Sequence, residues 1–489
     1  MNYLTKSDTR LHGQDRQEKT TSRKSNLKAA NPRGRKTSQR NWWMRVSGIF
    51  LLWATTAIAS HAQTFNTVVT FDGSNGYDPV TIVQGEDGNL WGATDNGGSS
   101  CGTVFNTTLA GVLTTSFAFH CATASNPYAL ILGTDGNFYG TTLDGGATNA
   151  GTIFRLTPGG SFTLLYAFDE SGGGGGEPEG ITEGTDGHFY GVTQKGGSFH
   201  QGTVFRMTPV GVLTTIYEFD TTHGSEPSGR PVEGFDGNFY GTTYAGGAYG
   251  GGTVYKINPS GTLAVLHSFG ESSSGYGLAN SLTLGLDGNF YGETLSGGPD
   301  NDGTTFKITP GGTFTNLHNF IGTDGSFLAG GLVQGTDGNL YGTAELGGAN
   351  GDGTVFEMST TGAVTTLYTF DGTDGEGPFH LIQDTSGTFY GLTNSTTSNY
   401  GTIFSLATGL GPFVKTLPTV GMAGETVTIL GTTLTGTTSV TFNGISATFT
   451  VVSPSLIKTT VPTGATTGPV QVTTPSGTLT SNVAFRVRP

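Results

Sequence analysis

Acidic, basic and aromatic side chains that could bind a ligand are scattered along this chain, mostly in glycine-rich segments. Carboxylates bind cations and hydroxyl groups, and aromatic rings stack on sugars, whereas catalysis needs an acid, a base or a nucleophile within reach of one another. The 9 histidines form no such set, because His200, His223 and His380 lie far apart and have no metal-ligand or triad spacing. We therefore expect no catalytic set and no cofactor.

The candidate binding residues share one property, which is that they lie in segments whose sequence changes along the chain. They are Tyr77, Asp78, Asp95, Asp144, Glu177, Glu179, His200, His223, Glu226, Arg230, Tyr244, Tyr249, Tyr276, Asp300, Asp302, Glu345, Asp352, Glu376, Phe379 and His380.

Seven acidic-Gly or Ser-Gly pairs could look like a calcium array, and Asp300-Asn301-Asp302-Gly303 is the segment richest in oxygen ligands. A calcium loop needs several oxygen ligands at close spacing, as in D-x-D-x-D-G. Each of these turns supplies one carboxylate at most, so we expect the Asp to stabilise its own turn. Calcium remains the alternative, and no metal site can be assigned.

A repeat determines where these residues lie. The turn glycines stand at positions 88, 136, 187, 237, 288, 338 and 387, so a unit of about 50 residues occurs seven times. Each unit contains four short β-forming runs, and the first two are joined by an Asp-Gly turn typical of hairpins. High glycine content (83 of 489 residues) and few charges fit an all-β protein with many turns. We predict an up-and-down seven-bladed β-propeller.

The last unit lacks its fourth strand, since the repeat stops near Leu406. The missing strand is found at the other end of the chain, where residues 65–72 match residues 365–371. An open ring would expose two strand edges to aggregation. The sequence therefore predicts that the N-terminal strand completes the last blade and closes the propeller.

This arrangement predicts one constant face and one variable face. The Asp-Gly and Pro-x-Gly turns are short, nearly invariant and fall at one end of every blade. The connections from strand 2 to strand 3, and from strand 4 to the next strand 1, fall at the other end and carry the candidate binding residues. A rigid scaffold that presents variable loops is a common recognition design. Unconstrained drift of these loops would look the same.

Large aromatics occupy one equivalent position in every unit. They could form a sugar-stacking platform, but aromatics at equivalent strand positions are more simply the core between blades. They are Trp91, Tyr139, Tyr190, Tyr240, Tyr291, Tyr341 and Tyr390.

Cys101 and Cys121 are the only cysteines. They flank the third and fourth strands of the first blade, and the turn near Gly111 places them opposite each other in that hairpin. An exported chain meets oxidising conditions, so we predict a disulfide. Free thiols are the alternative.

The repeat signature is Asp-Gly-Asn-Phe-Tyr-Gly-Thr-Thr, Gly-Gly, Gly-Thr-Val-Phe and Thr-Pro-x-Gly. It resembles the GloVer (Gloeo/Verruco) tandem repeat of exported bacterial proteins, which implies export and repetition but no established activity. The last copy departs from this pattern. Beyond Pro412, alternating β-formers resemble an IPT/TIG immunoglobulin-like domain, which implies a spacer or accessory binding role. We expect three parts, namely an extension with a signal peptide (1–62), the propeller (63–408) and the IPT/TIG β-sandwich (409–489).

Residues 1–62 look like a secretory leader, with basic residues, an apolar run and a small-x-Ala site that ends at Ala62. Met44 alone would begin a well-proportioned signal. This segment holds 12 of the 22 Lys and Arg residues but 3 of the 36 acidic residues, so the remainder is strongly acidic and disfavours nucleic acid. We expect an exported monomer without a transmembrane segment in its mature form, located in the periplasm, at the cell surface or outside the cell.

Three functions fit these features. The favoured hypothesis is a non-enzymatic binding or surface-interaction protein that uses the variable face to contact a glycan or a protein. A propeller enzyme is the second hypothesis, either a lyase or glycosidase acting on polysaccharide or an enzyme similar to streptogramin lyases. The third is a structural component of the cell surface. Fold alone does not decide among them.

Overall fold

The computed structural model describes residues 63–488, apart from residues 99–100, 171–174, 271–274 and 395–399. The expected secretory leader, residues 1–62, lies outside the described residues. The regular structure of the described part is entirely β, and it contains no helix that is long and apolar enough to cross a membrane.

In the described part of the chain, twenty-eight strands precede residue 410. The first half comprises β1 (Thr64–Thr70), β2 (Tyr77–Gln84), β3 (Leu90–Asn96), β4 (Thr103–Thr107), β5 (Leu113–Ala118), β6 (Ser125–Leu132), β7 (Phe138–Asp144), β8 (Thr152–Leu156), β9 (Phe162–Ala167), β10 (Gly176–Glu183), β11 (Phe189–Lys195), β12 (Thr203–Met207), β13 (Leu213–Glu218) and β14 (Ser225–Glu233). The second half comprises β15 (Phe239–Ala245), β16 (Thr253–Ile257), β17 (Leu263–Ser268), β18 (Thr283–Leu284), β19 (Phe290–Thr294), β20 (Thr304–Ile308), β21 (Phe314–Asn319), β22 (Val333–Gln334), β23 (Leu340–Ala344), β24 (Thr354–Met358), β25 (Val364–Thr369), β26 (Glu376–Gln383), β27 (Phe389–Asn394) and β28 (Thr402–Ala407).

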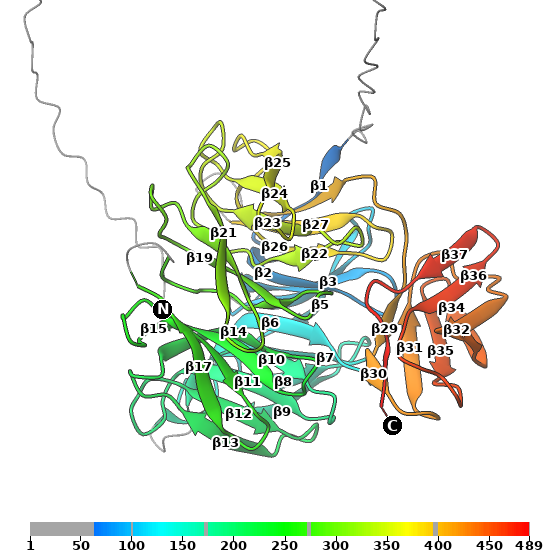
Figure 1. The fold of residues 1–489 in the computed structure, drawn as a ribbon, viewed down its shortest axis with the longest axis horizontal. Coiled ribbons are helices and arrows are strands. Elements are labelled where there is room, and N and C mark those ends of the chain that lie inside the picture. Colours follow the sequence, from blue (N-terminus) through cyan, green and yellow to red (C-terminus); the bar gives the residue numbers. More distant parts are fainter. Residues whose placement is uncertain (1–62, 99–100, 171–174, 271–274, 395–399, 489) are drawn as a thin grey trace, which may run out of the picture. The chain divides into compact units, whose positions relative to one another are not determined.

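These strands form four-stranded antiparallel sheets that are consistent with propeller blades. We call them sheet 1 (β2–β5), sheet 2 (β6–β9), sheet 3 (β10–β13), sheet 4 (β14–β17), sheet 5 (β18–β21), sheet 6 (β22–β25) and sheet 7 (β26, β27, β28 and β1). In Figure 1 the first strands β2, β6, β10 and β14 lie toward the middle of this group, and the fourth strands β13 and β25 lie toward its rim.

Each Asp-Gly turn is stabilised by its own side chains, as the turn in sheet 2 illustrates. Asp135 Oδ1 accepts the backbone N–H of Asn137 at 3.0 Å, and Asp135 Oδ2 accepts the hydroxyl of Tyr139 at 2.9 Å. Gly136 has a φ of +82°, which favours glycine. The carboxylate therefore stabilises the turn.

The equivalent aromatics form the core between sheets, as predicted. Tyr190 stacks on Phe239 of sheet 4 at 3.8 Å between ring centroids, and Tyr240 stacks on Phe290 of sheet 5 at 4.0 Å. Tyr190 and Tyr240 are both fully buried. Each ring thus packs on the next sheet, and the sugar-platform alternative is wrong because these rings are inaccessible.

A polar contact also joins neighbouring sheets at the Asp-Gly end. Glu183 of sheet 3 accepts both the backbone N–H of Thr134 (2.8 Å) and its hydroxyl (2.6 Å), and Thr134 begins the turn of sheet 2. Gln84 of sheet 1 makes the corresponding pair of bonds with Thr385 of sheet 7, at 3.0 and 3.1 Å. Sheets 1 and 7 therefore contact each other, although 301 residues separate this pair.

Strand β1 pairs with β28 in antiparallel register, from Thr64 opposite Ala407 to Thr70 opposite Thr402. Val69 of β1 is 6% exposed and belongs to an apolar cluster with Leu90 of sheet 1 and Tyr390 of sheet 7. The first described strand is thus the outer strand of the last sheet, beside the segment that the sequence indicated.

The C-terminal strands form two four-stranded sheets and one parallel pair. These strands are β29 (Lys415–Leu417), β30 (Val420–Gly421), β31 (Thr426–Leu430), β32 (Ser439–Phe442), β33 (Ile445–Ser446), β34 (Phe449–Ser453), β35 (Leu456–Thr460), β36 (Val470–Thr474), β37 (Gly477–Thr480) and β38 (Arg486–Val487). The orders are β29-β31-β35-β34 and β33-β32-β36-β37, and buried residues such as Val427, Ile457 and Val472 form one apolar cluster between them. This is the expected β-sandwich.

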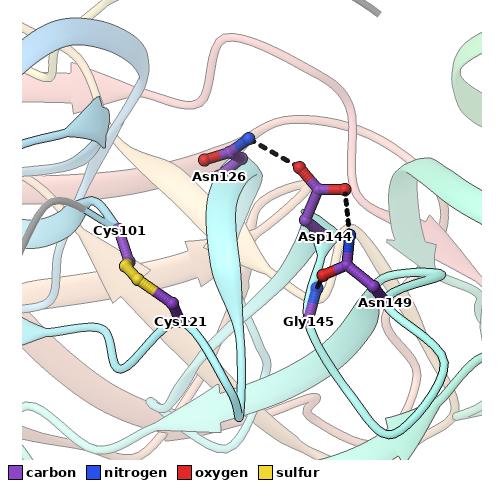
Figure 2. The surroundings of a disulfide bond; sticks show 6 residues. All are labelled: Cys101, Cys121, Asn126, Asp144, Gly145 and Asn149. Atoms are coloured by element: carbon purple, nitrogen blue, oxygen red, sulfur yellow. Dashed lines mark hydrogen bonds between the residues drawn. A yellow bond between two sulfur atoms is a disulfide. The ribbon is translucent and has the colours of Figure 1, made fainter.

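A disulfide joins Cys101 and Cys121 across the hairpin of β4 and β5, with 5.3 Å between the two Cα atoms (Figure 2). Thr103 pairs with Ala118 in that hairpin, so the two cysteines lie just beyond the last strand pair. The predicted disulfide is confirmed.

Removing this disulfide should destabilise the protein, because it closes a loop with a sequence separation of 20 residues. We expect a double Cys101→Ala, Cys121→Ala variant to lose about 3 kcal/mol of unfolding free energy. Denaturant unfolding with and without a reductant measures this loss. The reductant should lower the stability of the wild type but leave the double variant unchanged, and equal sensitivity of both would contradict the prediction.

Candidate functional site

A cavity of about 660 Å³ lies among the first strands of the sheets. Every one of sheets 1 to 7 contributes to its wall, through segments such as Val80 to Gln84 in sheet 1 and Tyr128 to Leu132 in sheet 2. Short first strands with alternating side chains position this wall, because every second residue of a strand faces the same side. The cavity is the candidate functional site.

The polar end of the cavity lies near the beginnings of the first strands. The first strands of the seven sheets can be aligned on the glycine or aspartate that begins the turn after each strand. In this alignment the polar residues of the wall fall at two positions of the repeat, which are occupied by Tyr128, Glu179, Arg230, Asn280 and His380. In an up-and-down sheet, this end of the first strand is the end that bears the longer connections.

The middle of the cavity is apolar, with Val83, Ile131, Val333 and Ile382 on the wall. At the Asp-Gly end the lining passes to residues of the C-terminal sandwich, including Lys415, Leu417 and Leu430. Leu430 belongs to an apolar cluster that also contains Trp91 and Leu132. The sandwich therefore covers this end of the cavity.

Polar contacts hold the sandwich against the Asp-Gly turns. Lys458 Nζ lies 2.6 Å from Glu86 Oε1, and the hydroxyl of Ser455 donates to the carbonyl of Glu86 at 2.8 Å. On other turns, Arg486 donates to the carbonyl of Phe235 at 2.9 Å and stacks over its ring. The contacts involve turns of sheets 1 and 4.

Lys415 is an unusual cation at the covered end. Its ammonium donates to the carbonyl of Gln383 at 2.5 Å and lies 5.6 Å from the ring centroid of Phe413. Burial lowers the pKa of Lys415 to about 8, although the nearby carboxylate of Asp384 opposes this effect.

Glu179 is the buried carboxyl of the polar end, at 7% exposure. Burial raises its pKa to about 7, against the opposing effect of hydrogen bonds from the Tyr128 side chain and the Gly229 backbone N–H. A carboxyl with such a pKa can either donate or accept a hydrogen bond near neutral pH.

His380 is neutral over the same range. Burial lowers its pKa to about 4, and its Nε2 lies 3.2 Å from the carbonyl of Ile82. The carbonyl can only accept, so Nε2 carries the hydrogen and Nδ1 is left as an acceptor. His380 also lies close enough to Arg230 for the positive guanidinium to lower its pKa further.

Four of the predicted binding residues come together in this cavity, namely Glu179, Arg230, Phe379 and His380. Outside it, His200, Tyr249 and Asp300 are exposed. The remaining predicted residues are half-buried at positions outside the cavity wall: Tyr77, Asp78, Asp95, Asp144, Glu177, His223, Glu226, Tyr244, Tyr276, Asp302, Glu345, Asp352 and Glu376.

Several of the half-buried residues hold their own loops in place. In Figure 2 both carboxylate oxygens of Asp144 are occupied, by Asn126 at 2.7 Å and by Asn149 at 3.1 Å. Glu177 forms an ion pair with Lys195 at 2.5 Å. These contacts show that the loop carboxylates stabilise their own loops. The sequence alone did not distinguish this role from ligand binding.

Sequence reasoning missed Tyr128, Asn280, Lys415 and the buried Glu293. The variation of the aligned position could have revealed the first two, since it holds Val80, Tyr128, Glu179, Gly229, Asn280, Gly330 and Phe379 in successive repeats. As for the calcium alternative, the described residues include no group of three or more His, Cys, Asp or Glu side chains that could hold a metal ion.

Comparison with sequence families gives two matches. The profile described as Gloeobacter/Verrucomicrobia repeat matches residues 54–183 and 177–404, and the profile described as IPT/TIG domain matches residues 413–487. Both resemblances inferred from the sequence are confirmed. No curated protein matches the chain.

Solved structures with similar architecture are distant in sequence. A gluconolactonase from Xanthomonas campestris is 10% identical, with 70% of this chain and 88% of that chain covered and a TM-score of 0.39. The extracellular domain of a one-component system from B. thetaiotaomicron is 11% identical, with 88% and 58% covered and a TM-score of 0.49. The periplasmic gluconolactonase of Pseudomonas aeruginosa is 17% identical, with 60% and 85% covered and a TM-score of 0.43. Similarity this low supports no inference about the chemistry of this chain.

Proposed function

Because this chain belongs to the Gloeobacter/Verrucomicrobia repeat family, we propose that it is an exported, non-enzymatic binding protein that takes a polar ligand, such as the end of a glycan, into its central cavity. The loops around the polar end of the cavity would contact the rest of the ligand. The IPT/TIG domain would cover the opposite end.

One observation carries this proposal, which is the combination of size and chemistry in the cavity. Its volume of about 660 Å³ lies within the range of roughly 300–1,000 Å³ typical of ligand pockets. An apolar middle and a few polar groups at one end, including Glu179, Arg230 and Asn280, are also typical of such pockets. Each of these groups comes from a different sheet, so the scaffold holds them apart at fixed positions.

The finer architecture belongs to the same proposal. Seven blades closed into a ring by β1 would make the cavity the centre of a propeller, with the propeller at residues 63–408 and the sandwich at 409–489. The contacts of Gln84 with Thr385 and of His380 with Ile82 support this arrangement, since both join sheet 7 to sheet 1. Residues 1–62 would direct export, and the mature chain would act as a monomer.

A broad glycan and polysaccharide panel tests the function. The purified protein is scored both for retention of each ligand and for release of products. We expect retention without turnover, and we expect a Glu179→Gln, Tyr128→Phe double variant to lose at least 10-fold in affinity for any retained ligand, because both hydrogen-bonding groups change. A Thr115→Ser variant, which alters an exposed residue of the outer strand β5 away from the cavity wall, is the control.

Product release would favour the second candidate, an enzyme. The observation that favours this candidate is Glu179, whose pKa of about 7 suits a general acid or base at neutral pH. Release that disappears in a Glu179→Gln variant would replace the binding proposal with an enzymatic one. If the double variant retains a ligand as tightly as the wild type and the control variant do, that ligand binds outside the cavity.

A further inference from the structure

Arg230 is a cation without a counter-ion in this cavity. Its backbone N–H donates to the hydroxyl oxygen of Ser281 at 2.8 Å, but its guanidinium has no ion pair among the described residues. The residue is exposed, because its side chain faces the open space of the cavity and not the packed core. The guanidinium stays charged, since arginine does not lose its proton in proteins.

Several other cations in the described part of the chain have an acidic partner. Lys195 pairs with Glu177, Lys256 with Asp236, and Lys458 with Glu86, at 2.5 to 2.7 Å. Arg230 differs from these cations because its exposed guanidinium faces the cavity without an ion pair to a described carboxylate. An anion supplied from outside would compensate it.

The neighbours of Arg230 leave this role open. Glu179 bonds instead to Tyr128 and to the backbone N–H of Gly229, and His380 is neutral. Space is also available, because a Cβ atom added at Gly331 on the same wall would meet nothing closer than Asn280 at 4.0 Å. The polar end of the cavity thus holds one permanent positive charge beside groups that donate and accept hydrogen bonds.

We propose that Arg230 is a carboxylate-binding subsite and that the ligand of the cavity is a saccharide with one carboxylate, such as a uronic acid. This inference rests on the proposed glycan-binding function and specifies its ligand class. The planar guanidinium binds a carboxylate through two parallel hydrogen bonds. A single charge matches a monoanion, whereas a phosphate dianion would require a second cation, and Lys415 lies at the covered end. Tyr128, Asn280 and Glu179 would then form hydrogen bonds with the hydroxyl groups of the saccharide.

The test compares two disaccharides of the same size, one ending in a uronic acid and the other in the corresponding neutral hexose. Titration calorimetry measures the affinity of the purified protein for each. We expect the acidic disaccharide to bind about 10- to 100-fold more tightly, which is the range for a hydrogen bond to a charged group. An Arg230→Gln variant should bind both with similar affinity, because only the acidic ligand loses its partner.

Two further variants separate shape from overall charge. Arg230→Lys keeps the positive charge but cannot form the bidentate hydrogen bonds, so it should retain part of the preference for the acidic disaccharide. Arg155→Gln removes one positive charge from β8, outside the cavity wall, and should keep the full preference. Circular dichroism confirms that each variant is folded.

The outcomes separate the two proposals. Equal binding of both disaccharides by the wild type, or an unchanged preference in Arg230→Gln, would overturn the carboxylate subsite while the glycan-binding function stands. Failure of either disaccharide and of the whole glycan panel to bind would overturn the function itself and the subsite with it. Loss of the preference in Arg155→Gln would assign it to net charge and also overturn the subsite.

Discussion

Replacing Val69 by Asp is expected to destabilise the protein by about 3–5 kcal/mol, because it places an unpaired carboxylate in an apolar cluster. Val69 is 6% exposed and packs with Ile82 and Leu90 of sheet 1 and with Tyr390 and Ile403 of sheet 7. The N-terminal strand therefore stabilises two sheets that lie at opposite ends of the sequence. Urea unfolding measures the loss, and size-exclusion chromatography detects association through the uncovered edge of β28.

A matched control lies two residues away on the same strand. Thr67 is exposed, so Thr67→Asp introduces the same charge without burial and should change the unfolding free energy by less than about 0.5 kcal/mol. If Val69→Asp prevents folding altogether, Val69→Ala provides the measurement, with an expected loss of about 2 kcal/mol. Equal stability of Val69→Asp and Thr67→Asp would contradict the packing of β1 and, with it, the proposed closure of the propeller.

The partner of β1 could be predicted because strand pairing leaves a local signature in a repeat. Residues 65–72 match a segment three hundred residues away, and the last repeat ends without that segment. The disulfide could be predicted for a similar reason, since hairpin register follows from the position of one turn. The aromatic core followed from equivalent positions such as Tyr190 and Tyr240.

The cavity could not be predicted in the same way. Its wall takes only two residues from each repeat at the polar end, and these residues resemble ordinary loop variation until the seven first strands are placed around one space. The covered end depends on residues of a different domain, such as Lys415 and Leu430, which no repeat period relates to the sheets. Proximity between such segments is set by packing and not by local propensity.

Most of the predicted loop residues illustrate a second limit. An acidic side chain in a variable loop suits either ligand binding or loop stabilisation, and the sequence does not show which hydrogen bonds it makes. Asp144 accepts bonds from two asparagines, and Glu177 pairs with a lysine. Glu179, two residues after Glu177, faces the cavity instead. Regular alternation would place both acids on the same face, but the positive φ of Glu177 (+52°) and the bulge between Pro178 and Gly180 break it, so the two side chains diverge.

Glu293 shows the opposite error, an ionisable group in a position that the repeat assigns to the core. It lies on β19 at 3% exposure, where the equivalent residues of other sheets are Thr141, Thr242 and Thr343. Its Oε2 accepts the backbone N–H of Gly331 at 2.9 Å, while its Oε1 is buried without a partner among the described residues. Burial raises the pKa of Glu293 to about 8.

This pKa makes the stability of the protein depend on pH. The folded state keeps the proton up to about pH 8, whereas the unfolded chain loses it near the ordinary value of 4.5. Between these values the folded state binds more protons, so its stability falls as the pH rises, by up to about 1.4 kcal/mol per pH unit. From pH 5 to pH 8 this single carboxyl can account for a loss of up to about 4 kcal/mol. Glu179 and Glu345, whose pKa values are also raised to about 7, act in the same direction.

A Glu293→Gln variant isolates the contribution of this one group. Its amide oxygen can still accept the bond from Gly331, but it does not titrate, so we expect a stability close to that of the wild type at pH 5 and a gain of several kcal/mol at pH 9. The Glu293→Thr variant carries the residue found at this position in three other sheets. Its unfolding free energy should depend on pH in the same way as that of Glu293→Gln. Denaturant unfolding of the three proteins at pH 5, 7 and 9 provides the comparison. Parallel pH profiles of wild type and Glu293→Gln would mean that Glu293 ionises at its ordinary pKa, and that water or a rearranged backbone reaches Oε1 between sheets 5 and 6.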